Sequence, residues 1–356
     1  MSKIYGVDCG TMFFQTAQYK DDGSIKIKTT RNAFVELAES EDEDIEEVLK
    51  QNDWHYVQDG RHYYVIGEDS LRVAKMFPGK VELRRPLKDG VMNKGEDKKM
   101  IVLAELVENS VGKAKGETDT ICTCVSSESV DGSSGNTFHS ARLKSMFTRL
   151  NWNVKIIEEG LAVVLSERPV AVNPQGEESP YSGLGISFGA GRVNCVLSFK
   201  GMKILGMSCA QSGDWIDAQV AKDTDAAISQ IIAKKENKLD FDNIDYDNEI
   251  IFALDAYYTS MLSSVFKKFA AKFVQEKTEF DAPIPVVVAG GTSLPNGFDG
   301  KVTEVINNLE LPFEIASVKR ASDPTGAVVK GLLAQASITA KKLGESKQID
   351  SMLGES

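Results

Sequence analysis

Two segments of the chain share one pattern of hydrophobic and polar positions. Between residues 3 and 30, three short runs of strand-forming residues are separated by tight turns, and the polar segment 21–24 forms the second turn. Residues 185–209 repeat this plan, with Lys200-Gly201 as the second turn. Recurrence of a whole supersecondary unit indicates an internal duplication. We therefore predict one three-stranded meander in each half of the chain.

Helical spacing dominates the segments that follow each meander. Apolar residues at steps of three and four predict helices over residues 96–111, 138–150, 158–167 and 248–277. The longest has one apolar face, formed by Ile251, Leu254, Tyr258, Met261, Leu262, Val265, Phe266 and Phe269. Further strands are expected over residues 120–125, 154–157 and 285–289. This alternation of strands and helices predicts an α/β protein with mixed sheets.

Polar segments mark the expected boundaries. The acidic block 39–47 and the aromatic-rich stretch 54–64 indicate a small insertion with a solvated helix or loop. Residues 169–183 are predicted to form a loop, and a domain boundary is expected within residues 151–183. The segment 341–356 is polar and weakly patterned, which predicts a flexible tail.

Composition narrows the class of protein. The chain has 356 residues, enough for two domains, and 42% of them are hydrophobic, as in a globular protein. No apolar run approaches the roughly 20 residues that span a bilayer, and the first residues lack a signal-peptide core, so we expect a cytoplasmic protein. The net charge of −11 opposes binding to nucleic acid and to anionic membranes.

Cysteine and histidine usage argues against a structural metal site. The five cysteines form no CxxC pair, so we expect reduced thiols that are mostly buried in strands. Only three histidines occur, scattered at positions 55, 62 and 139. A histidine-rich metal site is therefore not expected.

The first turn of the first meander is a candidate anion site. Asp8 ends the predicted strand, Gly10 follows, and Thr11 and Met12 complete the turn. Glycine lets the backbone approach a phosphate, and backbone N–H groups in such turns form anion-binding concavities. The carboxylate of Asp8 can hold Mg²⁺ through water. Taken alone, an ordinary hairpin turn is the alternative.

Two further glycine turns complete this pattern. Gly189, Ala190, Gly191 and Arg192 occupy the equivalent turn of the second meander, where a second phosphate-sized turn is expected to face the first across a cleft. Beyond the strand predicted at 285–289 come Gly290, Gly291 and Thr292, where missing side chains permit a nucleoside to lie against the backbone before a helix begins. A close-packed strand-to-helix turn is the alternative for this third element.

Five motifs in fixed order resemble the actin, sugar-kinase and heat-shock-chaperone ATPase superfamily over the whole chain. Residues 66–69 and 84–91 resemble its actin and rod-shape (MreB) branch, and residues 213–217 resemble the turn that opens the second small subdomain. A chaperone is less expected, because it would need a long substrate-binding region after the last motif. The five motifs are two phosphate motifs (4–11 and 185–194), two connecting helices (156–164 and 323–331) and an adenosine motif (286–295).

The resemblance implies an actin-like (ribonuclease H-like) duplicated fold around a nucleotide cleft. The two connecting helices are expected to approach closely, because small residues of the second (Gly326, Ala327 and Gly331) face small residues of the first (Gly160 and Ala162). Asp323 is expected to cap the second helix. The expected parts are a first lobe (1–155, with an insertion at about 31–85), a second lobe (156–320, with an insertion at about 208–248), a connecting helix (321–340) and the tail.

The resemblance also implies ATP or ADP with Mg²⁺ as ligands, and the choice between ATP and GTP stays open. Gly213 and Asp214 join the three turns as nucleotide-binding residues. Lys234 and Lys235 lie, with Gln230, on a helix where relatives hold adenosine, although solvated lysines are the alternative.

Two departures from the family pattern bear on hydrolysis. The aspartate that opens the second phosphate motif is replaced by Ser187, whose neutral hydroxyl supplies no charge, so a slow ATPase is expected. Actin-like proteins position the attacking water with a Gln or Glu, and the matching positions here are His139, Ser140 or Lys144, none of which is equivalent. Asp131 and Asn136 are nearby alternatives.

We expect an actin-like ATPase that assembles into filaments of its own copies, with an adaptor or cargo that the sequence does not identify. A nucleotide switch or scaffold that neither polymerises nor hydrolyses ATP is the alternative favoured by Ser187. A small-molecule kinase is a third hypothesis, for which no general base can be assigned.

Overall fold

The structure is a computed structural model that describes residues 2–38, 45–77, 79–92, 97–132 and 136–354. Its residues group into two units. Unit 1 comprises Met1–Thr123, Thr137–Ile156 and Gln335–Ser356, and unit 2 comprises Cys124–Asn136 and Ile157–Ala334. Each unit is therefore assembled from separate stretches of sequence.

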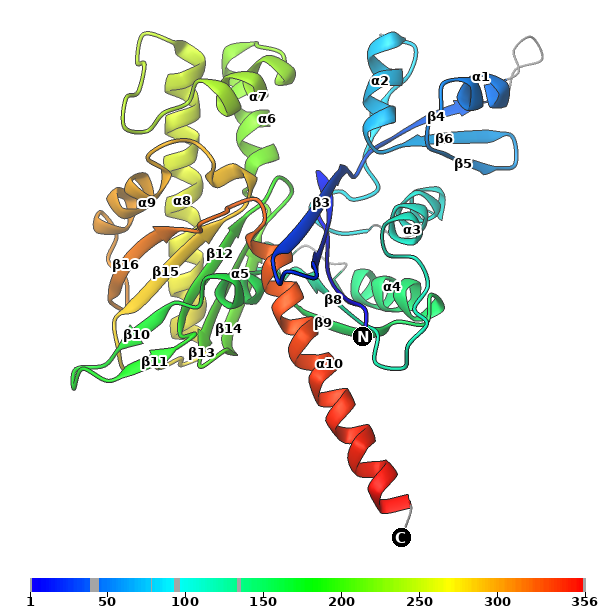
Figure 1. Cartoon of the computed structure of the whole chain (residues 1–356). Helices are drawn as coiled ribbons and strands as arrows, with labels where there is room; N and C mark the ends of the chain where they lie inside the picture. Colours follow the sequence, from blue (N-terminus) through cyan, green and yellow to red (C-terminus); the bar gives the residue numbers. More distant parts are fainter. Residues whose placement is uncertain (1, 39–44, 78, 93–96, 133–135, 355–356) are drawn as a thin grey trace. The chain divides into compact units, whose positions relative to one another are not determined.

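A five-stranded sheet with the order β3-β2-β1-β8-β9 forms the centre of unit 1 (Figure 1). β1 pairs antiparallel with β2 and parallel with β8, and β2 pairs antiparallel with β3, which confirms the first predicted meander. The strands are β1 (Ile4–Cys9), β2 (Phe13–Tyr19), β3 (Ile25–Arg31), β8 (Thr120–Val125) and β9 (Asn153–Glu158).

A smaller sheet, β5-β6-β4-β7, occupies the region predicted as the first insertion. Successive residues of a strand point to opposite faces, so Phe34 packs with Val102 and Leu106 of α3 while Val35 packs with Leu49 and helix α2. The elements of this region are β4 (Phe34–Ala38), α1 (Ile45–Gln51), β5 (Tyr56–Asp59), β6 (His62–Ile66), α2 (Glu68–Met76) and β7 (Leu83–Arg84), followed by α3 (Asp97–Val111) and α4 (Asn136–Arg149).

Unit 2 repeats the strand order of unit 1 in its sheet β14-β13-β12-β15-β16. β12 pairs antiparallel with β13 and parallel with β15, as β1 does with β2 and β8. The second predicted meander is thereby confirmed. The strands are β12 (Gly183–Phe188), β13 (Val193–Phe199), β14 (Met202–Cys209), β15 (Ile284–Ala289) and β16 (Ile315–Arg320).

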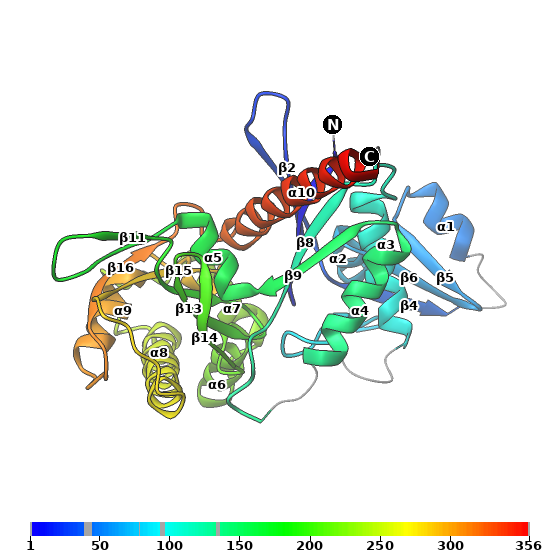
Figure 2. The same cartoon turned by 90° about the horizontal axis from the view of Figure 1, so that it is seen from below.

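One face of this sheet carries the main core of unit 2. Helix α8 (Glu249–Gln275) lies on it, and all eight residues predicted for the apolar face of this helix are buried. Full burial of such side chains stabilises the fold by about 1.5–3 kcal/mol each. Figure 2 shows α6 and α8 together on one side of the sheet. The other helices here are α6 (Gly213–Thr224), α7 (Ile228–Asn237), η1 (Gly291–Ser293) and α9 (Phe298–Asn307).

The opposite face of the same sheet is lined by small residues, which admit helix α5 (Glu159–Glu167) at close range. A Cβ atom on Gly185 would lie 2.4 Å from the carbonyl oxygen of Gly160. Helix α10 (Ala327–Gly354) then packs on α5, since a Cβ atom on Gly331 would lie 1.8 Å from the carbonyl oxygen of Ala162. Gly331 thus meets Ala162 as predicted, whereas the prediction for Gly160 was wrong, because this residue approaches the sheet.

Other segments differ from the sequence predictions or extend them. The predicted loop 169–183 contains a hairpin of two short strands, β10 (Val170–Val172) and β11 (Glu178–Pro180). Helix α10 includes most of the segment for which a flexible tail was predicted. Most of the acidic block, residues 39–44, lies outside the described residues. In the described ranges, no helix combines the length and apolarity that a membrane crossing needs.

Candidate functional site

The turn between β1 and β2 is the first part of the candidate site, and it lies in unit 1. Strand pairing ends at Cys9 and Phe14, so residues 10–12 form the turn. A Cβ atom on Gly10 would lie 2.9 Å from the carbonyl oxygen of Phe13 and 3.8 Å from a carboxylate oxygen of Asp8. The tight turn and the carboxylate beside it therefore require glycine at position 10.

Asn32 holds this turn in place, and the sequence analysis did not identify it. Its side-chain amide donates to the carbonyl of Gly10 (2.8 Å), and its backbone N–H donates to that of Met12 (2.9 Å). The side chain is fully buried, and its Oδ1 atom has no hydrogen-bond partner in the part of the chain that the structure describes. Because 22 residues separate Asn32 from Gly10, no local pattern connects the two.

The second turn, between β12 and β13 in unit 2, has the same geometry. A Cβ atom on Gly189 would lie 2.9 Å from the carbonyl oxygen of Arg192, as one on Gly10 would from that of Phe13. The start of α6 supports this turn, because the N–H groups of Gly213 and Asp214 donate to the carbonyls of Gly189 (3.1 Å) and Ala190 (2.8 Å). The predicted residues Gly213 and Asp214 thus bind the turn through their backbones.

The third turn lies against the second in the same unit. The hydroxyl of Thr292 donates to the carbonyl of Gly189 (3.0 Å). Gly290 has a φ of 94°, and a Cβ atom there would lie 2.4 Å from the carbonyl oxygen of Phe188, so glycine is required. A Cβ atom on Gly291 would meet nothing within 4 Å, which leaves room beside this backbone.

The two lysines predicted to bind adenosine are engaged by protein groups. The ammonium of Lys235 lies 2.6 and 2.7 Å from the two carboxylate oxygens of Asp217, and both side chains are largely buried. Burial raises the pKa of Asp217, while the charge of Lys235 opposes that shift. Lys234 donates to the side-chain oxygen of Asn248 (2.9 Å). Lys235 therefore ties α7 to the start of α6.

A row of buried polar residues crosses the small-residue face of the unit 2 sheet. Ser187 pairs with Asn194 across β12 and β13, and Asn194 pairs with Ser208 across β13 and β14. All three are at most 2% exposed. The predicted binding residue Arg192 is also buried, and it donates to the hydroxyl of Ser208 (3.1 Å).

Glu159 brings a carboxylate to this row, and the sequence analysis did not single it out. It is the first residue of α5, and its Oε2 atom accepts a hydrogen bond from the side-chain amide of Asn194 (2.8 Å). This pair lies directly beside Ser187 in the strand register. A signal was present, because an acidic pair, Glu158 and Glu159, stands where a strand passes into a helix.

The candidates predicted to position water are buried or bonded to other protein groups. His139 is 2% exposed in helix α4 of unit 1, and burial lowers its pKa to about 4. Asp131 forms an ion pair with Lys268 (2.6 Å). Asn136 donates to the carbonyls of Ser126 (2.9 Å) and Ser127 (2.7 Å). A buried neutral imidazole carries no charge at neutral pH.

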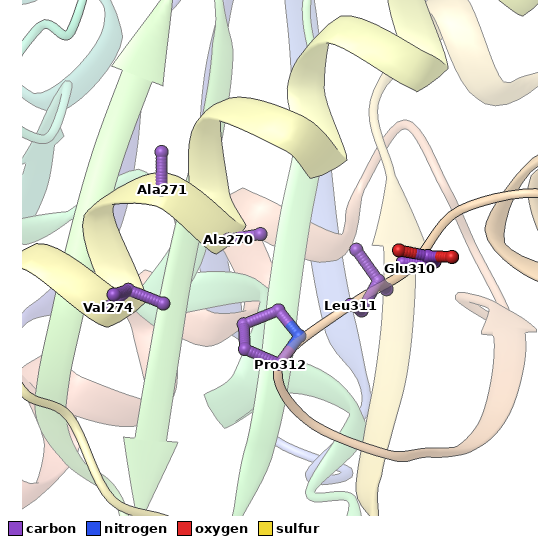
Figure 3. A pocket seen from close by; sticks show the side chains of 6 residues that line it. All are labelled: Ala270, Ala271, Val274, Glu310, Leu311 and Pro312. Carbon is purple, nitrogen blue, oxygen red and sulfur yellow. The ribbon is translucent and has the colours of Figure 1, made fainter.

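Two observations bear on metals and on other ligand sites. Among the described residues, no cluster of three or more His, Cys, Asp or Glu side chains is arranged to hold a metal ion. The carboxylate of Asp8 lies beside the first turn, next to Gly10. A separate apolar depression of about 530 Å³, between α8 and the loop before β16, contains none of the candidate residues (Figure 3).

Solved structures with the same architecture define the fold. The chain is similar to the MamK double helical filament, with 17% identity, a TM-score of 0.63, and coverage of 94% of this chain and 98% of that chain. It is similar to MreB 5 of Spiroplasma citri bound to AMPPNP, with 15% identity, a TM-score of 0.62, and coverage of 97% of this chain and 98% of that chain. The ethanolamine utilization protein EutJ from Carboxydothermus hydrogenoformans is a more distant match, with 13% identity, a TM-score of 0.50, and coverage of 93% of this chain and 89% of that chain. The protein therefore has the actin-like fold.

The sequence itself identifies the family. The sequence model of the Volactin family matches residues 3–336, and the chain belongs to this family. Among curated protein sequences no match is found. The predicted fold class and the resemblance to actin-like proteins are confirmed.

Proposed function

We propose that the chain binds ATP or ADP and assembles into filaments whose formation depends on the nucleotide, with ATP hydrolysis in the assembled state. The observation that carries the proposal is the repeated turn geometry at Gly10 and Gly189, in equivalent places of two duplicated sheets. Backbone cradles of this kind suit phosphate oxygens. The similarity to a MamK filament and to nucleotide-bound MreB 5 supports the same reading.

The third turn suits the nucleoside part of the ligand. Gly290 is held close to β12, and Thr292 is hydrogen-bonded to the second turn. The open space at Gly291 leaves the backbone accessible to a flat ring system. Lys235 would act here by supporting α6 through Asp217, and not by direct contact with the ligand.

Glu159 is the residue of unit 2 best suited to act as general base. Asn194 orients its carboxylate, and the pair lies beside the strand that ends in the second turn. In the proposed step, the oxygen of a water molecule bonds to the γ-phosphorus of ATP, and the bond from that phosphorus to the bridging oxygen breaks. The water proton passes to Glu159, and ADP and phosphate are the products.

Magnesium, when bound, would neutralise charge on the phosphates. Asp8 would hold the hydrated ion, since it is the carboxylate beside Gly10. Ser187 supplies no second charge, and its buried position beside Ala289 leaves little room for a hydrated ion. Hydrolysis is accordingly expected to be slow.

Sedimentation of the full chain with ATP, with ADP and without nucleotide tests the proposal, together with negative-stain electron microscopy and measurement of phosphate release. We expect filaments and phosphate release with ATP. Gly189→Ala should reduce assembly, because its Cβ atom would press on the carbonyl of Arg192. Gly300→Ala is the matched control, since a Cβ atom there meets nothing within 4 Å. A chain that remains monomeric at high concentration with ATP would contradict the filament proposal.

A nucleotide switch without hydrolysis is the second candidate, favoured by the neutral Ser187. Tight ATP binding without phosphate release and without filaments would support it. Transfer of labelled phosphate to a sugar or carboxylic acid acceptor would instead indicate a small-molecule kinase.

A further inference from the structure

Residues 124–132, which we call the strap, include the end of β8 and continue beyond it. They contact strand β14 and helix α8 of unit 2. The backbone of the strap pairs with the end of β14, where the N–H of Val130 donates to the carbonyl of Ser208 (3.0 Å). The N–H of Ser208 in turn donates to the carbonyl of Glu128 (2.8 Å). Ser129 and Ser208 form a parallel bridge. The strap therefore pairs with the edge strand β14 through one isolated bridge.

Ser127 connects the strap to the Glu159–Asn194 pair. Its backbone N–H donates to Oδ1 of Asn194 (3.3 Å), and its hydroxyl donates to the carboxylate of Glu158. Its carbonyl accepts hydrogen bonds from Ser208 and from Asn136. Ser127 is 1% exposed, so these bonds are made without competition from water. Because Oδ1 of Asn194 is held by Ser127, the amide group of Asn194 is directed at Glu159.

Two ion pairs hold the strap to α8. Lys272 lies 2.5 Å from Glu128, and Lys268 lies 2.6 Å from Asp131. Asp131 also accepts a hydrogen bond from the N–H of Ala210 (2.7 Å). Lys272 is largely buried, whereas the side chain of Glu128 is 77% exposed. Two lysines of α8 thus hold acidic residues of the strap, and Ser127 connects the strap to the polar row.

We propose that the strap positions the Glu159–Asn194 pair, with Ser127 as the positioning residue and the ion pairs to α8 as the contacts that keep the strap in place. This inference rests on the proposed function, because it concerns the same general base. Loosening the strap leaves the backbone cradles of the three turns intact, since within the described ranges the hydrogen bonds that hold these turns come from residues outside 124–132. Catalysis should therefore fall while nucleotide affinity is kept.

Three variants of the full chain test the inference. Ser127→Ala keeps the backbone N–H that bonds Asn194 but removes the hydroxyl bond that anchors the strap to Glu158, the residue before the proposed base, so the strap holds Asn194 less firmly. We expect kcat for ATP hydrolysis to fall about tenfold with the Kd for ATP changed less than about twofold. Glu128→Lys places a positive charge beside Lys272, and a fall of about threefold is expected. Glu276→Lys is the matched control, because Glu276 also pairs with Lys272 but lies outside the strap.

Amide hydrogen exchange gives a readout that does not depend on hydrolysis. Glu128→Lys should speed exchange at the N–H groups of Val130 and Ser208 about tenfold, and Glu276→Lys should not. Unchanged exchange in Glu128→Lys, unchanged kcat in Ser127→Ala, or a rise in the Kd for ATP that matches the loss of kcat would each overturn the inference. A parent chain that binds ATP without releasing phosphate would instead overturn the proposed hydrolysis, and exchange alone would then decide whether the ion pairs hold the strap.

Discussion

The two glycine turns have the same backbone geometry but different chemistry around them. At Gly10 and at Gly189, the position of a Cβ atom is limited by the carbonyl oxygen three residues further on, at 2.9 Å in both cases. The first turn has Asp8 beside it and is held by one buried side chain, Asn32. The second has the neutral Ser187 and is held by the backbone of α6 and the hydroxyl of Thr292.

This difference indicates how a duplicated fold can divide its functions. In the proposed function, the shared backbone geometry would give each unit a phosphate cradle. The carboxylate at the first turn suits the cation, while the polar row at the second turn leads to Glu159 and suits proton transfer. Under this proposal, the neutral Ser187 would affect cation binding first and would leave the general base in place.

The largest effect is expected for the proposed base. Glu159→Gln keeps the hydrogen bond with Asn194 but removes the basic oxygen, so kcat for ATP hydrolysis should fall about 10²- to 10³-fold. The Kd for ATP should change less than about twofold, as measured by calorimetry. Glu178→Gln, at an exposed position of β11, serves as the control carboxylate. Hydrolysis at the parent rate in Glu159→Gln would assign the base to another residue.

The second prediction concerns a difference between the two units in the pH dependence of their stability. All three histidines of the chain lie in unit 1. His139 is buried, and its pKa is lowered to about 4 from an ordinary 6.5. As the pH falls below 6.5, the unfolded chain binds a proton that the folded chain excludes, so stability decreases until the pH reaches about 4. Between pH 7 and pH 5 the loss should be about 2 kcal/mol.

Urea unfolding monitored by circular dichroism at both pH values would measure this loss. His139→Leu, of similar volume, removes the titrating group, and its free energy of unfolding should depend less on pH than that of the parent by the same amount. If the parent and the variant lost stability equally between pH 7 and pH 5, the imidazole would not be buried as described.

The sequence predicted both turns but did not identify Asn32 or the Glu159–Asn194 pair beside them. The meanders depend on a local period of two residues, and the long core helix on a local period of 3.6 residues, so both could be predicted from neighbouring positions. Asn32 and the Glu159–Asn194 pair depend on contacts between residues 22 and 35 positions apart. The hairpin β10–β11 was missed because its strands have only three residues each and are separated by the turn residues Asn173, Pro174 and Gly176.

The smallest of these effects distinguishes the two turns directly. Asp8→Asn removes the carboxylate of the first turn while keeping its size, and the affinity for ATP in the presence of Mg²⁺ should fall about tenfold, with little change in the presence of a chelator. Ser187→Ala removes the corresponding polar group of the second turn, and the change should be less than about twofold in both conditions, because no charge is lost. Fluorescent nucleotide titration with and without Mg²⁺ measures both variants. Equal losses would show that Ser187 contributes to cation binding after all, and the division between a cation-binding first turn and a proton-transferring second turn would then be wrong.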